Sequence, residues 1–139
     1  MKTLTAVLIS LFSLFSYANC LKLSGIYSCE NDSSKINLRL QYSPYNNVYG
    51  MQLNDEPYLR YEEGDWAATI NLLTGGAFTG LTTKVVCQED SVLFRLKVIM
   101  EIGGSQYDVI NDYEIKPVEG GGLILKSIVE GEEPVVHHC

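Results

Sequence analysis

Four cysteines are the residues of this chain with the widest chemical range: Cys20, Cys29, Cys87 and Cys139. Thiolates can bind zinc or act as nucleophiles, but these cysteines lack the paired Cys-x-x-Cys spacing of a structural zinc site. An even number of cysteines in an exported chain instead indicates disulfides, and three pairings of four cysteines are then open. We therefore predict two disulfides and no metal site.

The histidines are confined to one place, His137 and His138, close to Glu132 and Glu133. Adjacent residues of an extended strand point to opposite faces, so a single metal ion could not readily bind both rings. We interpret this segment as an ordinary surface tail. Any nucleophile activated by a histidine would have to use these two rings.

A short acidic segment, residues 62–65, lies between Tyr61 and Trp66 and contains Glu62, Glu63 and Asp65. Paired carboxylates can hydrolyse glycosides, but that reaction also needs a long substrate cleft and a carboxylic acid of raised pKa. A solvated turn between strands is the simpler interpretation. The sequence thus predicts no catalytic residue and no cofactor, and we expect a protein that is not an enzyme.

The first 18 residues have the pattern of a cleaved secretory signal peptide. Lys2 supplies the positive start, Leu4 to Phe15 form an apolar run too short to span a bilayer, and Ser16-Tyr17-Ala18 offers small residues for cleavage. We expect residues 19–139 to form one secreted or periplasmic domain. Lipid anchoring through Cys20 is the alternative, although Asn19 and Tyr17 do not match the residues that acylation normally requires.

The chain is acidic, with a net charge of −7. Removal of residues 1–18 would leave nine basic and 17 acidic residues, a net charge of −8. Nucleic acids and anionic membranes attract basic surfaces, so we expect neither as a partner. An acidic surface keeps an exported protein in solution, and it would also attract a basic protein partner.

Apolar and polar residues alternate along most of the remaining chain, and no segment has the periodicity of an amphipathic helix. The predicted strands are 25–30, 36–42, 49–53, 58–61, 66–73, 81–87, 92–102, 107–115 and 123–129. Tight turns join most of them, which favours antiparallel neighbours. We predict an all-β, up-and-down meander of eight or nine strands, closed into a barrel because closure removes exposed edges. A two-sheet β-sandwich is the alternative, and residues 71–80 could be a bulged strand or a loop over the barrel mouth.

The closed meander suggests how the cysteines pair. If the first strand lies antiparallel to the segment 123–130, the residues that precede the first strand lie close to the residues that follow residue 130. Cys20 then lies near Cys139, and Cys29 is left with Cys87. We therefore predict the pairs Cys20–Cys139 and Cys29–Cys87.

The start of the first strand, Leu23-Ser24-Gly25-Ile26-Tyr27, resembles the opening motif of the lipocalins (calycins). In that family a glycine and an aromatic residue close the bottom of an eight-stranded barrel. The resemblance implies a barrel with an apolar cavity for a small lipophilic ligand. The aromatic residue here is Tyr27 instead of the usual tryptophan, and no helix is predicted after the last strand.

Tyr27-Ser28-Cys29 is also similar to a Tyr-x-Cys in the first strand of the bacterial C-type lysozyme inhibitors, small exported barrels. That resemblance implies a loop that enters the active-site cleft of lysozyme. Tyr58-Leu59-Arg60-Tyr61 shares only the general character of such a loop.

Aromatic residues gather in one part of the chain: Tyr42, Tyr45, Tyr49, Tyr58, Tyr61 and Trp66. Such side chains are favoured at binding surfaces and equally favoured on strands, where they pack against neighbours. We predict a possible binding surface here. The leading functional hypothesis is an exported binding module for a small apolar ligand or for a protein, and the alternative is an inhibitor of a basic hydrolase such as lysozyme.

Asn31-Asp32-Ser33 is a glycosylation sequon that has meaning only in a eukaryotic host.

Overall fold

The computed structural model describes residues 20–44, 48–63, 67–70 and 80–139, and in 67–70 it describes the backbone alone. These residues form ten strands and no helix. The strands are β1 Gly25–Glu30, β2 Lys35–Ser43, β3 Val48–Leu53, β4 Leu59–Glu62, β5 Ala67–Ile70, β6 Gly80–Cys87, β7 Val92–Ile102, β8 Ser105–Pro117, β9 Leu123–Val129 and β10 Val135–His138. The bulged strand or loop expected at residues 71–80 lies outside the described residues, except for Gly80, which begins β6.

The strands form a single antiparallel sheet in the order β4-β3-β2-β1-β10-β9-β8-β7-β6-β5. Every neighbour in this order is also a neighbour in sequence, except that β1 pairs with β10 and so joins the two ends of the chain. The sheet therefore runs up and down around a ring, as predicted. The all-β meander is confirmed.

The ring is nearly closed by contacts between β4 and β6. Glu63 forms an isolated parallel bridge with Val85, and the Thr83 hydroxyl donates a hydrogen bond to the Arg60 carbonyl oxygen at 2.5 Å. These contacts join β4, at one end of the sheet, to β6, the neighbour of the other end strand β5, without a continuous ladder. The barrel is thus closed across most of its circumference by paired strands, and at one seam by side-chain and bridge contacts.

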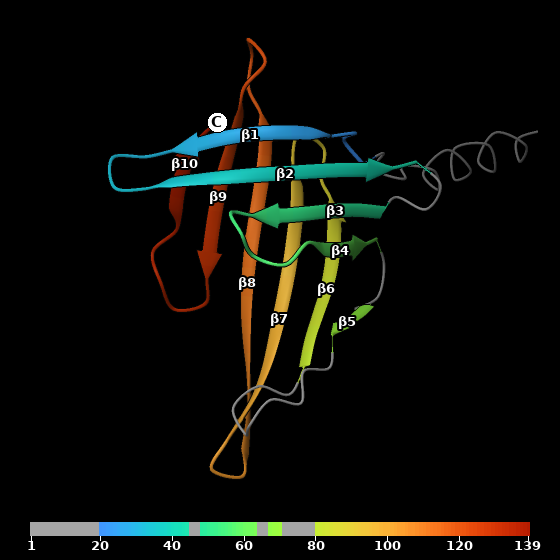
Figure 1. Ribbon diagram of the computed structural model, residues 1–139, viewed down its shortest axis with the longest axis vertical. Coiled ribbons are helices and arrows are strands. Elements are labelled where there is room, and N and C mark those ends of the chain that lie inside the picture. The colour runs from blue at the N-terminus through green and yellow to red at the C-terminus, as the bar shows by residue number, and fades with distance from the viewer. Residues whose placement is uncertain (1–19, 45–47, 64–66, 71–79) are drawn as a thin grey trace, which may run out of the picture.

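Two layers of strands are visible in Figure 1, with β1–β4 crossing in front of β6–β9. One face of each layer is turned toward the other, and the alternation of each strand places its apolar residues on that face. Most of the buried core residues are aliphatic, such as Leu38, Ile115 and Leu125. Phe94 of β7 makes edge-to-face contacts with Tyr49 of β3 and Tyr61 of β4, at centroid distances of 5.3 and 5.2 Å. Aromatic rings from both layers therefore meet within this core.

Strand β10 was not predicted from the sequence, and it changes how the barrel closes. After β9 the chain turns at Gly131, which has a φ of 83°, and returns as the short strand β10 between β9 and β1. The expected pairing of the first strand with residues 123–130 is wrong for this reason. The register instead places Glu30 opposite His138, so the C-terminus lies at the end of β1 and not at its start.

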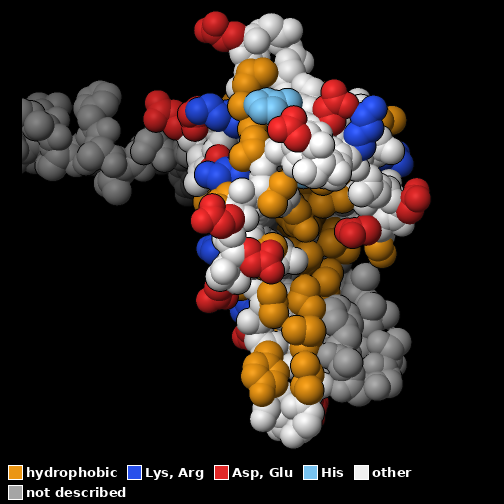
Figure 2. Space-filling view, turned by 90° about the vertical axis from the view of Figure 1, so that its left-hand side faces the viewer, with side chains coloured by type: hydrophobic (Ala, Val, Ile, Leu, Met, Phe, Trp, Pro, Cys, Tyr) orange, Lys and Arg blue, Asp and Glu red, His pale blue; other side chains and the backbone are white. Residues whose placement is uncertain are grey.

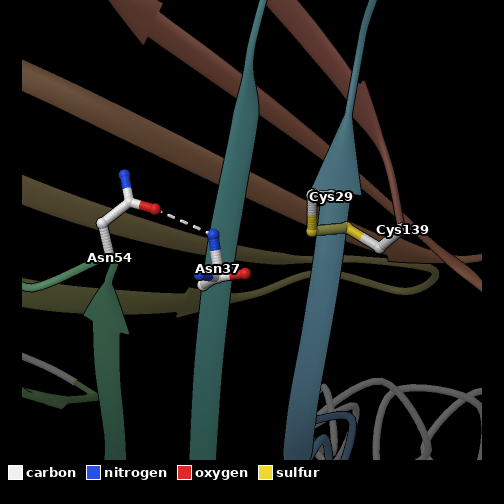
Figure 3. The surroundings of a disulfide bond; sticks show 4 residues. All are labelled: Cys29, Asn37, Asn54 and Cys139. Atoms are coloured by element: carbon white, nitrogen blue, oxygen red, sulfur yellow. Dashed lines mark hydrogen bonds between the residues drawn. A yellow bond between two sulfur atoms is a disulfide. The ribbon is translucent and has the colours of Figure 1, made fainter.

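The predicted disulfide pairs are wrong as a direct consequence. The structure pairs Cys29 with Cys139 and Cys20 with Cys87. Figure 3 shows the first of these bonds joining β1 to the residue that follows β10. The second bond joins the segment before β1 to the end of β6, and thus ties the two layers together. Two disulfides indicate an oxidising compartment, in agreement with the expected export.

Figure 3 also shows how the neighbouring hairpin is held in register. Asn54, just after β3, has a φ of 52° and accepts a hydrogen bond from the Asn37 amide through its Oδ1 at 2.9 Å. The Asn54 amide donates in return to the Asn37 carbonyl oxygen at 2.7 Å. Asparagine tolerates this left-handed conformation better than most residues.

Across the described ranges, no helix is long and apolar enough to cross a membrane.

Candidate binding face on strands β2 to β4

A tyrosine lies across the outer face of the sheet because the strand beneath it has a glycine. Gly50 faces outward from the middle of β3, between Gln41 of β2 and Arg60 of β4. A Cβ at Gly50 would overlap the ring and hydroxyl of Tyr58, which precedes β4. A glycine within a strand often marks such a close approach by another group. Gly50 therefore allows the Tyr58 ring to rest on the backbone of β3.

Two further contacts hold this ring in place. The Tyr58 hydroxyl donates a hydrogen bond to Gln41 Oε1 at 3.2 Å, which spans from the start of β4 to β2. The Arg39 guanidinium lies 5.7 Å from the centre of the ring, within the range of a cation–π interaction. The tyrosine is thus fixed from both sides, yet it remains 43% exposed.

Beside this ring the outer surface is hollowed into a groove of about 350 Å³. The lining residues are Gln41, Ser43, Val48, Tyr49, Gly50, Tyr58 and Arg60. We call the outer surface formed by Arg39, Gln41, Gly50, Tyr58 and Arg60 the Tyr58 face. It combines an exposed aromatic ring, an amide and two guanidinium groups, a mixture that suits recognition of polar and aromatic groups of a partner.

The charges of the Tyr58 face differ from those of the whole protein. Arg60 pairs with Glu62 on the same strand at 2.8 Å, and the Arg60 side chain is 61% exposed. Arg39 makes no ion pair with any described residue. An exposed ion pair contributes little to stability, so both guanidinium groups remain available to a partner. The acidic chain therefore presents a locally basic site.

Two of the tyrosines predicted to form a binding surface are buried. Tyr49 and Tyr61 are 0% and 1% exposed and lie in the core, so they cannot belong to an exposed binding surface. Tyr42 is half-buried and packs against Tyr49 with ring centres 4.9 Å apart. Tyr45 and Trp66 lie outside the described residues. Of the described members, Tyr58 alone has the exposure that such a surface needs.

Burial also changes the acid–base properties of the core tyrosines. Desolvation raises the pKa of Tyr49 and of Tyr61 well above the ordinary value, and the neighbouring tyrosines Tyr42 and Tyr113 act in the same direction. Both side chains therefore stay neutral across the physiological range. They pack as neutral side chains against Phe94.

Little space remains beside these rings at the β3–β4 end of the barrel. A cavity of about 20 Å³ lies there, lined by residues that include Leu53, Tyr61 and Tyr113. This volume is close to the minimum that a single water molecule needs. A small lipophilic ligand could not enter this part of the interior without displacing core side chains.

The two described carboxylates of the acidic turn, Glu62 and Glu63, have different neighbours. Glu62 is paired with Arg60, as described above, and Asp65 lies outside the described residues. The Glu63 carboxylate lies with the sulfurs of Cys20 and Cys87, all within 4.8 Å of one another. Because these two cysteines are joined in a disulfide, they offer no thiolate to a metal ion. The arrangement has the residue types of a metal site without its chemistry.

The two histidines do point to opposite faces of an extended strand, as expected, but the segment is not a free tail. His137 in β10 is 3% exposed, and its Nε2 lies 2.8 Å from the Ser34 hydroxyl in the β1–β2 turn. Asn31 of the same turn donates a hydrogen bond to the Val136 carbonyl oxygen at 3.3 Å. The segment therefore locks β10 onto the turn next to it.

Sequence reasoning missed Arg39, Gln41 and Gly50 as parts of the site. One signal was available, because Gly50 interrupts the alternation of a predicted strand, and such a glycine suggests close approach of another group. Nothing in the sequence identifies that group as Tyr58.

The barrel architecture agrees with the fold that the lipocalin resemblance implies. In comparisons with known proteins, the chain matches no family model, no curated protein and no solved structure at a significant level.

Proposed function

We propose that this protein is an exported binding module that holds a protein partner at the Tyr58 face. The observation that carries the proposal is the fixed and exposed ring of Tyr58, seated over Gly50 and held by Gln41 and Arg39. An aromatic side chain that is already immobilised loses little entropy on binding. Tyrosine and arginine are also the residues that most often dominate the energetics of protein interfaces.

The partner group that best fits the site carries a carboxylate near an apolar or aromatic surface. Arg39 and Arg60 flank the ring, and a guanidinium can bind a carboxylate through two parallel hydrogen bonds. Val48 supplies an apolar part of the groove. The alternative of a small apolar ligand inside the barrel has less support, because the cavity beside Tyr61 and Tyr113 holds only about 20 Å³.

The proposal can be tested by quantitative affinity capture from the exported fraction of the native host, with the disulfide-bonded protein as bait. The Tyr58→Ala and Arg39→Ala variants should each lose a partner that the wild-type protein retains. Val118→Ala is the control, since Val118 is 38% exposed in the turn between β8 and β9, outside the Tyr58 face. A partner lost with Val118→Ala and kept by both other variants would contradict the proposal.

Inhibition of a basic hydrolase is the second candidate, and the charges of the Tyr58 face favour it. Glycoside hydrolases of this kind carry two catalytic carboxylates, which the guanidinium groups of Arg39 and Arg60 could engage. The acidic protein as a whole would attract a basic enzyme over longer distances and so raise the association rate. The local and the overall charge thus act together.

A lysozyme activity assay tests this second candidate. At micromolar concentration and low salt, the wild-type protein should slow a C-type lysozyme, and the double variant Arg39→Ala, Arg60→Ala should not. Lys116→Ala is the control for a general loss of positive charge, because Lys116 lies on β8 away from this face. Absence of any inhibition by the wild-type protein would remove the inhibitor hypothesis and leave the wider binding proposal intact.

A further inference from the structure

The hairpin of β7 and β8 extends beyond the rest of the barrel and leaves one strand edge open. β8 pairs with β7 from Ser105 to Ile115, but it pairs with β9 only from Asn111 to Pro117. No other described strand pairs with residues 105–110. Among the described residues, this part of β8 is therefore an edge strand, and Figure 1 shows it in the long hairpin that projects from the barrel.

The backbone groups on that free side follow from the turn. Gly103 and Gly104 have φ of 61° and 81° and form a two-residue hairpin turn. In such a turn the flanking residues, here Ile102 and Ser105, face each other as a hydrogen-bonded pair. Antiparallel strands bond at every second facing pair, so the amide and carbonyl groups of Gln106 and Asp108 point away from β7. They point toward the free side of β8.

The covered part of the edge begins directly after these residues. The Glu130 amide donates to the Ile110 carbonyl oxygen at 3.4 Å, where the chain leaves β9. A strand added beside Gln106 and Asp108 would therefore continue the line of β9 along β8. Unpaired edges of this kind are templates for strand addition by another chain.

Side chains along the hairpin give this edge an apolar face. Ile102 and Tyr107 are 56% and 52% exposed, and Met100, Val98 and Val109 on the same face are half-buried. Figure 2 shows hydrophobic side chains gathered in a stripe along this part of the molecule. An added strand with apolar residues at every second position could cover the stripe.

The opposite face of the hairpin carries more acids than bases. Glu101, Asp108 and Glu130 are exposed, and none of them makes an ion pair with a described residue. Two bases share this face: Arg95, which pairs with Asp112 at 3.0 Å, and Lys97, which lies opposite Ile110. A second copy of the chain would bring two such acidic edges together, and its overall negative charge would add to the repulsion. A strand whose polar positions are basic would be attracted instead.

We propose that the β8 edge at residues 105–110 binds an extended strand of a partner protein in which apolar and basic residues alternate. Main-chain hydrogen bonds to Gln106 and Asp108 would give the strand its direction and register. Its apolar side chains would cover the stripe, and its basic side chains would pair with Asp108 and the neighbouring acids. This edge is separate from the Tyr58 face, so the two proposals can fail independently.

The experiment uses the full exported domain with both disulfides and a capped hexapeptide of alternating lysine and valine as the probe. Backbone amide shifts are recorded by NMR while the peptide is added to millimolar concentration at low salt. We expect the largest shifts at residues 105–110 and at Glu130. A capped peptide of alternating glutamate and valine is the charge control and should bind several-fold more weakly, with the difference reduced at high salt.

Three variants separate main-chain pairing from charge. Gln106→Pro removes an outward amide without changing charge, and it should weaken binding about tenfold. Gln106→Thr keeps the amide and should bind like the wild-type protein. Asp108→Lys should reverse the preference between the two peptides. All three substitutions lie near the tip of the hairpin, and the unchanged NMR spectrum of the barrel would show that it remains folded.

Three results would overturn the proposal. One is the absence of amide shifts in the wild-type protein at millimolar peptide, and another is equal binding of both peptides. The third is concentration-dependent self-association through residues 105–110 without peptide, detected by sedimentation, which would identify a second copy as the occupant.

Discussion

The ring of Tyr58 occupies the space above Gly50 that a side chain at that position would need. This relationship links the start of β4 to the middle of β3, and the hydrogen bond to Gln41 extends it to β2. Three strands thus hold one exposed tyrosine, and the position of the ring depends on a residue that has no side chain of its own. The proposed binding face therefore rests on a backbone feature.

A substitution at Gly50 tests this dependence. We expect Gly50→Ala to push the Tyr58 ring off the sheet, since the ring sits at the end of a side chain that can rotate outward. The change in stability should stay within about 1 kcal/mol, because the site is on the surface and the core is untouched. The ring-current shift of the Arg39 side-chain protons should disappear in the NMR spectrum, as it should in Tyr58→Ala. A preserved shift in Gly50→Ala would show that the ring does not depend on the glycine.

The site was harder to predict than the fold because exposure depends on how strands pair. Alternation correctly places Tyr49 and Tyr61 on strands, but it does not say which face becomes the interior until the register is known. Their spacing in the sequence is compatible with a surface cluster, and the structure buries them against Phe94. Tyr58 differs because it precedes β4 and folds back over a neighbouring strand.

Peptide mapping under non-reducing conditions should recover the linked pairs Cys20–Cys87 and Cys29–Cys139. The sequence separations are 67 and 110 residues, so removal of either pair should lower the free energy of unfolding by about 2–5 kcal/mol. Double serine variants and urea unfolding measure this loss. In Cys29→Ser, Cys139→Ser, the amides of β10 should also exchange with solvent faster, because that bond anchors the short last strand. Recovery of a Cys20–Cys139 peptide would contradict the structure.

The fold could be predicted from the sequence as far as the alternation is long and regular. Strands such as β2, β7 and β9 have several alternating residues, and tight turns define their order. β10 has only four residues after Pro134, too few for a periodic pattern to stand out, and its existence reverses the direction of the chain end. One short strand therefore decided the disulfide pairing, whereas the class of fold did not depend on it.

The buried tyrosines predict a loss of stability in alkali. Burial raises the pKa of Tyr61 and of Tyr113 in the folded state, while the unfolded chain ionises tyrosine near pH ~10. Their contribution to stability is therefore complete below that pH and declines as pH rises toward the folded pKa. Urea unfolding between about pH 8 and pH 11 should show this decline. Tyr61→Phe should reduce it, whereas Tyr107→Phe, at an exposed position, should leave it unchanged.

The ion pair between Asp90 and Lys116 predicts the opposite dependence at acidic pH. Their Oδ2 and Nζ atoms lie 2.9 Å apart, and the hydrogen bond from Lys116 holds the pKa of Asp90 below its ordinary value. A lowered carboxyl pKa stabilises the fold above the unfolded pKa of ~3.9, and this contribution is lost as pH falls through the folded value. Both side chains are exposed, so the effect should be small and weaker at high salt. Asp90→Asn should be less stable than the wild-type protein at neutral pH in urea unfolding, and the two should converge once the pH lies below the lowered pKa of Asp90. A difference that persists there would mean that Asp90 acts through turn geometry between β6 and β7 and not through its charge.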